Sequence, residues 1–300
     1  MNGTQFGRTN MSLNDRFFAY INFFMNYIQF LKLYKSRYRN YVSILYHVLR
    51  NNYPVQAVFN SGETILLKDY QEVFNNLNEL DVDPIQDVVY FDDLKFYGGK
   101  TNGDVLHVFK MNEYSFLPVE HKEIIDIGAN IGDSSVYFAS RGAGKVIALE
   151  PDKISFDYAL KNITLNGFSK IINILWAGCG STDISSTAEN PEILTLKTLV
   201  EKYCSCPQIL KIDCEGCEYD LILNASCDDL ERFTHIQIEY HFGYQNLKTK
   251  LEECGFEVRR TRPTYFIPMN KNRTSRLVLG NEIVQSKKWI IGSRYATRTR

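Results

Sequence analysis

The stretch Glu123-Ile-Ile-Asp-Ile-Gly-Ala-Asn-Ile-Gly-Asp133 carries the clearest structural signal in this chain. It begins as a short apolar run of isoleucines without helical spacing, which predicts a buried β-strand. Gly128, Asn130 and Gly132 then break the run, and residues 134–140 have the character of a helix. A strand, a glycine turn and a helix in this order open the nucleotide pocket of a doubly wound α/β domain. Glycine suits such a turn because the missing Cβ lets a ligand approach the backbone.

A second strand supplies the acid that such a pocket needs. Residues 145–150, Lys-Val-Ile-Ala-Leu-Glu, predict a buried strand that ends in Glu150. This acid lies roughly 20 residues beyond the glycine turn, where nucleotide-binding domains place a carboxylate that grips a ribose diol. We therefore predict that Glu150 binds a ribose rather than serving as an ordinary loop glutamate.

The charges around the glycine turn indicate which nucleoside binds. A dinucleotide fingerprint has a second glycine where this chain has Asn130, and Asp126 and Asp133 flank the turn. Two carboxylates favour a cationic ligand over a diphosphate on Coulomb grounds. S-adenosylmethionine (SAM) carries a sulfonium, an ammonium and a ribose but no phosphate, so the pattern favours SAM over NAD.

Three sequence blocks together resemble the FkbM family of class I methyltransferases. They are Asp-Ile-Gly-Ala-Asn-Ile-Gly-Asp at 126–133, Ala-Leu-Glu-Pro at 148–151 and Leu-Lys-Ile-Asp-Cys-Glu-Gly-Cys-Glu at 210–218. The resemblance covers about residues 105–295. It implies a Rossmann-like α/β sheet, mostly parallel with an antiparallel last strand, and methyl transfer from SAM to a hydroxyl of a sugar, glycan or natural product. The chain departs from the family at Lys197, where the pattern Thr-Leu-Asp-x-Leu has an acid.

The predicted cofactor site lies at the carboxyl ends of the strands, where open α/β sheets bind their ligands. A third predicted strand, residues 171–176, is followed by Ala-Gly-Cys-Gly at 177–180, whose backbone we expect near the adenine. The predicted cofactor-binding residues are Asp126, Gly128, Asn130, Gly132, Asp133, Glu150, Pro151, Ala177 and Gly178.

Acidic residues gather after the fourth and fifth predicted strands, residues 208–213 and 234–240. The predicted catalytic residues at these two strand ends are Asp213, Glu215, Glu239 and His241, with Glu218 close by. Such a cluster suits a general base that takes the proton of an acceptor hydroxyl, and it would also suit a divalent cation such as Mg²⁺. A solvated acidic loop with Lys211 as its counter-charge is the alternative interpretation.

The cysteine pattern leaves its chemistry open. The chain has seven cysteines, an odd number, and their pattern does not resemble a small secreted disulfide scaffold. We expect mostly free thiols in an intracellular protein. Cys214 and Cys217 form a Cys-x-x-Cys, and Cys204 and Cys206 lie just before them, so a zinc or redox site is the alternative.

The chain is expected to have three parts, residues 1–54, 55–120 and 121–300. In the first part, residues 17–34 are rich in aromatic and aliphatic side chains but carry a polar stripe, which predicts an amphipathic helix. Packing on the protein itself, a peripheral membrane contact and a homo-oligomer contact all remain open for it. A second helix is expected at residues 41–49.

The middle part predicts a small β-rich module that precedes the SAM-binding domain. Its pattern indicates a β-hairpin over residues 56–67 and a helix over 70–80, and then three strands. The three strands are expected at residues 88–91, 94–97 and 105–109. In the third part, residues 256–260 and 288–292 should form the final antiparallel pair.

Composition narrows the function further. A formal net charge of −1 argues against a general nucleic-acid binder, and 44% hydrophobic residues suffice for a sizeable core. Residues 1–15 lack the apolar region of a secretory signal, so a cytoplasmic location is expected. Two other classes stay open, a non-catalytic SAM-binding scaffold and an NAD-linked oxidoreductase, although no hydride-transfer triad is visible.

Overall fold

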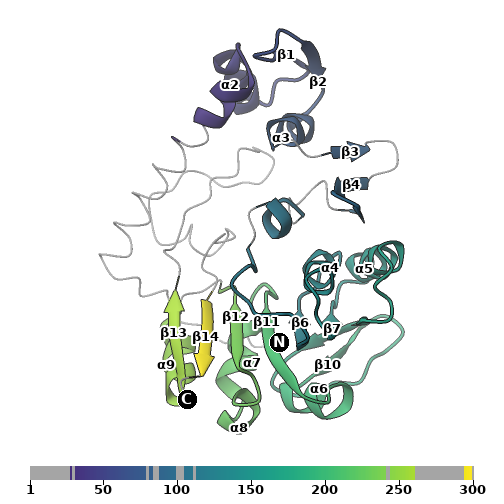
Figure 1. Ribbon diagram of the computed structural model, residues 1–300, viewed down its shortest axis with the longest axis vertical. Coiled ribbons are helices and arrows are strands. Elements are labelled where there is room, and N and C mark those ends of the chain that lie inside the picture. Colours follow the sequence, from purple (N-terminus) through teal and green to yellow (C-terminus); the bar gives the residue numbers. More distant parts are fainter. Residues whose placement is uncertain are drawn as a thin grey trace. The chain divides into compact units, whose positions relative to one another are not determined.

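The computed structural model describes residues 28, 31–78, 81–83, 88–98, 105–110, 113–240, 244–260 and 294–298. The described residues divide into two compact units, one up to residue 81 and the other from residue 82 onward (Figure 1). The boundary at residue 81 therefore falls inside the segment 55–120. None of the helices that the structure describes combines the length and the apolar character needed to cross a bilayer.

The first unit contains two helices and a β-hairpin. They are α2 (Tyr41–Arg50), β1 (Val55–Val58), β2 (Thr64–Leu67) and α3 (Tyr70–Asn78). Ile44 and Val48, four residues apart on one face of α2, are buried and join a core that includes Tyr34 and Tyr38. These elements confirm the predicted second helix, hairpin and third helix. Residues 31–37 are helical, whereas most of the predicted amphipathic segment 17–34 lies outside the described residues.

A three-stranded sheet and a short helix precede the main sheet of the second unit. The strands are β3 (Asp81–Asp83), β4 (Val88–Phe91) and β5 (Leu94–Tyr97), and the helix is η1 (Leu106–Lys110). The predicted strand at 105–109 is wrong, because this segment is a π-helix. Four of its five residues are apolar and buried, and so short an apolar run has the same appearance in a buried strand and a buried helix.

The second unit is built on a sheet of seven strands in the order β13-β14-β12-β11-β6-β7-β8. Their bounds are β6 (Glu123–Ile127), β7 (Lys145–Leu149), β8 (Ile172–Leu175), β11 (Pro207–Ile212), β12 (His235–Ile238), β13 (Phe256–Arg260) and β14 (Arg294–Arg298). The five strands from β12 to β8 are parallel, and β14 runs antiparallel to both β12 and β13. This topology confirms the predicted fold class. The last strand is β14 at 294–298, whereas the predicted segment 288–292 lies outside the described residues.

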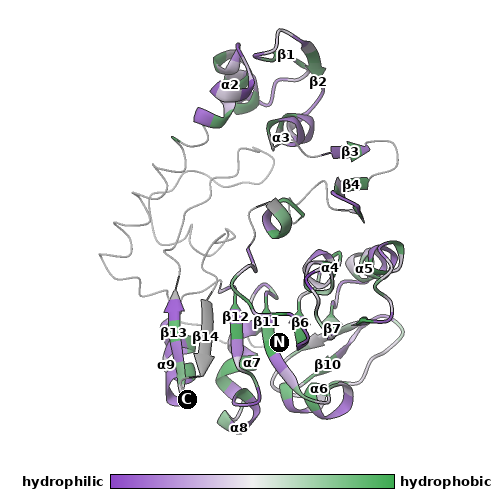
Figure 2. Ribbon diagram, viewed as in Figure 1, coloured by the Kyte–Doolittle hydropathy of each residue, from purple (hydrophilic) through white to green (hydrophobic). Residues whose placement is uncertain are grey.

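Helices cover both faces of this sheet because its strands are apolar on both sides. Ile124 and Val146 point to the core that contains α4 (Asp133–Ser140) and α5 (Lys153–Leu165). Ile125 and Ile147 point to the opposite core. The helices of that core are α6 (Leu196–Tyr203), α7 (Cys217–Asn224), α8 (Cys227–Leu230) and α9 (Gln245–Glu253). Figure 2 shows the apolar colour on much of the central strand β12 and the hydrophilic colour on much of the edge strand β13.

The segment after β8 contains a strand pair that the sequence pattern did not predict. β9 (Ala177–Cys179) pairs in parallel with β10 (Glu192–Leu194) outside the main sheet. After this pair, α6 begins at Leu196, where the Thr195 hydroxyl accepts a hydrogen bond from the Thr198 amide at 3.2 Å. Threonine is a favoured N-cap residue because its hydroxyl satisfies such an amide. Lys197 lies exposed on this helix.

Four of the seven cysteines form disulfides, so the expectation of mostly free thiols is wrong. Cys214 is bonded to Cys217, and Cys227 is bonded to Cys254 across a separation of 27 residues. Cys227 begins α8 and Cys254 follows the end of α9. The tertiary fold, and not sequence spacing, brings the second pair together.

Asn162 of α5 ties the helix to two other segments. Its fully buried amide oxygen accepts a hydrogen bond from the Tyr97 amide at 2.8 Å, and its Nδ2 donates to the carbonyls of Tyr97 at 3.1 Å and Ile131 at 2.8 Å. Asn166 lies one turn later and is half-buried. Its side-chain oxygen accepts a hydrogen bond from the Lys95 amide, and its Nδ2 donates to the Lys95 carbonyl. The helix therefore supports both the small sheet and the glycine turn.

We expect Asn162→Ala to lower the free energy of unfolding by about 1–3 kcal/mol, because it leaves the Tyr97 amide and the Ile131 carbonyl without partners. Urea denaturation monitored by circular dichroism measures this change. Asn166→Ala is the matched control and should cost less, since solvent reaches its partners. Equal losses for the two variants would contradict the special role of Asn162.

Candidate active site

The glycine turn between β6 and α4 has a backbone that few residues other than glycine adopt. Gly128, Asn130 and Gly132 have φ angles of 76°, 48° and 83°. A Cβ atom on Gly128 would overlap the carbonyl oxygen of Asp213, so this position requires glycine. Asparagine at Asn130 is one of the residues that tolerate the left-handed region. The turn therefore packs directly on the chain that leaves β11.

Glu150 is held at the end of β7 by two backbone amides. Its Oε2 accepts from the Asn130 amide at 2.8 Å and its Oε1 from the Asp152 amide at 2.8 Å. Burial raises the pKa of this carboxyl above its usual value, and the two amide bonds oppose that rise. A carboxylate has about four lone-pair sites, so each oxygen retains one acceptor site after these two bonds. The position fits the predicted ribose ligand.

The predicted adenine segment lies beside Pro151. A Cβ atom on Gly178 would lie 3.7 Å from the Cβ of Pro151, and Trp176 Nε1 donates to the Pro151 carbonyl at 2.9 Å. Ala177 and Gly178 are buried. Cys179 is also buried, and its burial raises the pKa of the thiol to about 12. The thiol therefore stays protonated and acts as a packing residue rather than as a nucleophile.

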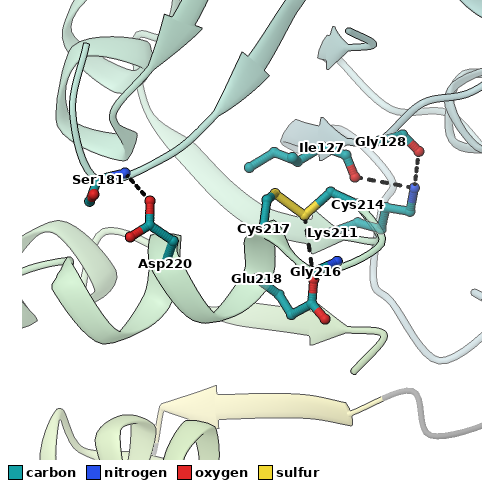
Figure 3. The surroundings of a disulfide bond; sticks show 9 residues. All are labelled: Ile127, Gly128, Ser181, Lys211, Cys214, Gly216, Cys217, Glu218 and Asp220. Atoms are coloured by element: carbon teal, nitrogen blue, oxygen red, sulfur yellow. Dashed lines mark hydrogen bonds between the residues drawn. A yellow bond between two sulfur atoms is a disulfide. The ribbon is translucent and has the colours of Figure 1, made fainter. Parts of the chain in front are cut away.

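Asp126 has an internal partner for its charge. It is fully buried at 0% exposure, its Oδ1 lies 3.0 Å from Nζ of Lys211, and its Oδ2 accepts from the hydroxyls of Ser134 and Ser135 at 2.7 and 2.6 Å. The Lys211 ammonium also donates to the carbonyl of Gly128 at 2.8 Å (Figure 3). Asp126 thus joins β6, α4 and β11 beneath the glycine turn.

Lys211 is a residue whose role the sequence pattern understated, since it suggested only a counter-charge for a loop. Burial by itself lowers the pKa of Lys211, but the charges of Asp126, Asp213 and Asp133 outweigh burial and raise it above the usual value. The ammonium therefore stays protonated and holds the turn. The signal for this role was a lysine inside the apolar run of β11.

The acids of the predicted catalytic cluster start where β11 and β12 end. Asp213 is half-buried, and its amide donates to the Ile127 carbonyl at 3.0 Å. Glu239 is half-buried, and its amide donates to the Ile212 carbonyl at 2.8 Å. Because β11 and β12 are neighbouring parallel strands, both acids lie at one edge of the sheet.

The remaining members of the acidic block have different surroundings. Glu215 is exposed, whereas Glu218 is fully buried and accepts from the Gly216 amide at 2.7 Å (Figure 3). His241 lies outside the described residues. Among the residues that the structure describes, no three His, Cys, Asp or Glu side chains gather in an arrangement suited to a metal ion.

Comparison with known families identifies the domain that contains this site. A family model described as "Methyltransferase FkbM domain" matches residues 126–258. The match spans the glycine turn, Glu150 and the acidic block. No curated protein matches this chain.

Solved structures with similar folds include several methyltransferases. An FkbM methyltransferase from Methylobacillus flagellatus KT covers 61% of this chain at 16% identity and a TM-score of 0.44, and the match spans only 45% of that protein. TrmK of M. capricolum bound to S-adenosylhomocysteine (SAH) covers 63% of this chain and 66% of its own, at 13% identity and a TM-score of 0.41. The match to the N-terminal domain of human METTL16 bound to SAH covers 85% of this chain and 94% of that domain, at 16% identity and a TM-score of 0.40.

Proposed function

We propose that this chain, whose residues 126–258 match the FkbM methyltransferase domain, transfers the methyl group of SAM to a hydroxyl oxygen of a sugar, glycan or natural product. The observation that carries this proposal is the geometry of Glu150. A buried carboxylate at the end of the second strand of the parallel sheet retains one acceptor site on each oxygen, which suits the two hydroxyls of a ribose.

The surrounding residues fit the rest of the cofactor. The glycine turn, with positive φ at Gly128 and Gly132, leads directly into Asp133, whose negative charge suits the cationic methionine end. Pro151, Ala177 and Gly178 supply small, mostly apolar surface for the adenine. When bound there, SAM supplies an electrophilic methyl group. Asp126 contributes indirectly, because it forms an ion pair with Lys211, whose ammonium holds the carbonyl of Gly128.

The chain's own contribution to the chemistry is to position the acceptor and take its proton. Asp213 and Glu239 lie at the end of neighbouring strands, at the edge of the sheet where the cofactor residues also lie. We propose Asp213 as the general base, with Glu215, Glu239 and His241 as the other members of the cluster. A carboxylate that takes the hydroxyl proton makes the oxygen a better nucleophile.

Glu150→Ala is expected to weaken the binding of SAH by about 1–3 kcal/mol, because charge-assisted hydrogen bonds to the ribose are lost. Isothermal titration calorimetry measures the affinity. Glu189→Ala, which changes an exposed acid that is not among the proposed cofactor residues, is the matched control and should bind like the original chain.

This titration, together with an assay of methyl transfer, tests the role of Glu150 and distinguishes the classes of protein that the sequence left open. Binding of NAD in place of SAH would favour the oxidoreductase. Unchanged SAH affinity in a folded Glu150→Ala protein would remove Glu150 from the site. SAH binding without methyl transfer to any hydroxylated acceptor in a panel of sugars, glycans and natural products would favour the non-catalytic scaffold.

The proposal also includes the class of the methyl acceptor and the cellular location of the protein. The net charge of −1 supports a small molecule or glycan rather than a nucleic acid. A cytoplasmic location, with residues 17–34 as a membrane-surface or homo-oligomer contact, stays a proposal. The cysteines do not support it, since disulfides are typical of oxidising compartments.

A further inference from the structure

The Cys214–Cys217 disulfide lies inside the acidic block, directly after Asp213 (Figure 3). Both cysteines are partly exposed, whereas Cys254 of the other disulfide is buried at 2% exposure. Thiol–disulfide exchange requires that an attacking thiolate reach one sulfur of the pair. Cys227 of the second pair is half-buried like Cys214 and Cys217, so the first disulfide differs in presenting two partly exposed cysteines to a reductant instead of one.

The ring closed by this disulfide contains a backbone that an open chain would not favour. Glu215 and Gly216, the two residues between the cysteines, have φ angles of 56° and 125°. A left-handed conformation is unfavourable for a residue with a side chain such as Glu215. The covalent ring limits the other conformations that this turn could adopt.

The turn is linked to both sides of the proposed cofactor site. On one side, the carbonyl of Asp213 packs against Gly128 of the glycine turn. On the other side, Cys217 begins α7, whose Asp220 accepts a hydrogen bond from the Ser181 amide at 2.7 Å (Figure 3). Ser181 directly follows the predicted adenine segment 177–180. A change in the turn therefore reaches both segments through short contacts.

We propose that Cys214–Cys217 is a redox modification site at which a dithiol reductant opens the disulfide and thereby weakens cofactor binding. The inference rests on the proposed SAM site. A thiolate of the reductant attacks one sulfur and forms a mixed disulfide, and the second thiol of the reductant then displaces the cysteine. Two electrons and two protons pass to Cys214 and Cys217, and the reductant leaves as a disulfide.

Reduction acts on the turn and not on the chemistry of the cofactor. Without the covalent ring, Glu215 can leave the left-handed region, and both the Asp213 carbonyl and the first turn of α7 lose a fixed position. Cys179 does not exchange with the opened pair, because burial raises the pKa of its thiol and keeps it protonated. A disulfide oxidant that accepts the two electrons and two protons, and is itself reduced to a dithiol, restores the original arrangement.

The test is a titration of the oxidised full-length chain with SAH, repeated after treatment with dithiothreitol. We expect reduction to raise the Kd for SAH by about 5-fold or more, at the lower end of typical couplings between two sites. Free thiols are first blocked with N-ethylmaleimide, and those released by dithiothreitol are labelled with iodoacetamide. Mass spectrometry then shows which disulfide has opened.

Two double variants assign the effect to one disulfide. Cys214→Ala with Cys217→Ala should show the weaker affinity with or without dithiothreitol. Cys227→Ala with Cys254→Ala is the matched control and should retain the shift, because Cys214 and Cys217 are intact. If the first double variant does not fold, the control variant with and without dithiothreitol still decides the question.

The possible results separate this inference from the proposed function. No binding of SAH by the oxidised chain would contradict the proposed function itself. Binding that stays constant while Cys214 and Cys217 are demonstrably reduced would overturn the inference alone. A lower melting temperature with unchanged affinity would also overturn it, since the disulfide would then only stabilise the fold. A shift that disappears in the control variant would assign the effect to Cys227 and Cys254.

Discussion

Asp213→Asn is expected to lower the rate of methyl transfer by about 10²–10⁴-fold while SAH still binds, because an amide cannot take a proton from the acceptor. The substitution keeps the size of the side chain. It also leaves the amide bond to the Ile127 carbonyl and the packing of the Asp213 carbonyl on Gly128 in place. A single-turnover assay with labelled SAM and an accepted hydroxyl substrate measures the rate.

Glu215→Gln is the comparison within the same turn, and its exposed side chain should matter less if Asp213 is the base. Repeating the assay with a chelator tests the metal version of the proposal, in which the acids hold Mg²⁺ and the cation lowers the pKa of the hydroxyl. Loss of turnover with intact SAH binding would favour the metal. Near-normal rates for Asp213→Asn, Glu239→Gln and His241→Ala, with chelator present, would place the base elsewhere.

Lys211→Met should lower the free energy of unfolding by about 3–5 kcal/mol, because removal of one partner leaves the Asp126 charge uncompensated in the core. Both side chains are almost fully buried, at 2% and 0% exposure. Urea denaturation measures the loss. The glycine turn should also loosen, since the ammonium no longer holds the Gly128 carbonyl.

Replacement of both partners should recover part of this loss. In Lys211→Met with Asp126→Asn the charge is gone, and the oxygen of the new amide side chain would still accept from the hydroxyls of Ser134 and Ser135. Lys145→Met is the matched control, because the Lys145–Glu123 pair has the same 3.0 Å separation but a lysine that is 41% exposed. It should cost at most about 1 kcal/mol through the ion pair. Equal losses for the two lysine variants would contradict the importance of burial.

Local sequence patterns were sufficient to predict the central part of the fold, including the strands and the turn on which the candidate cofactor residues lie. They encode a strand, a glycine turn and a helix over residues 123–140, and these formed as predicted. The same holds for the strand that ends before Glu150. Such features are readable because strand alternation and the need for glycine at positive φ act over a few neighbouring residues.

How these segments meet follows from the tertiary structure. Lys211 reaches Asp126 because β11 lies beside β6 in the sheet. The order of the strands in the sheet depends on the crossover connections, and the spacing of residues in the sequence does not reveal it. Cys227 and Cys254, 27 residues apart, likewise meet only in the folded chain. The helix at 106–110 was mistaken for a strand because burial on all sides removes the periodicity that distinguishes the two. Local chemistry therefore specified the strands and turns, whereas the tertiary structure selected Lys211 as the charge partner of Asp126 and brought Cys227 to Cys254.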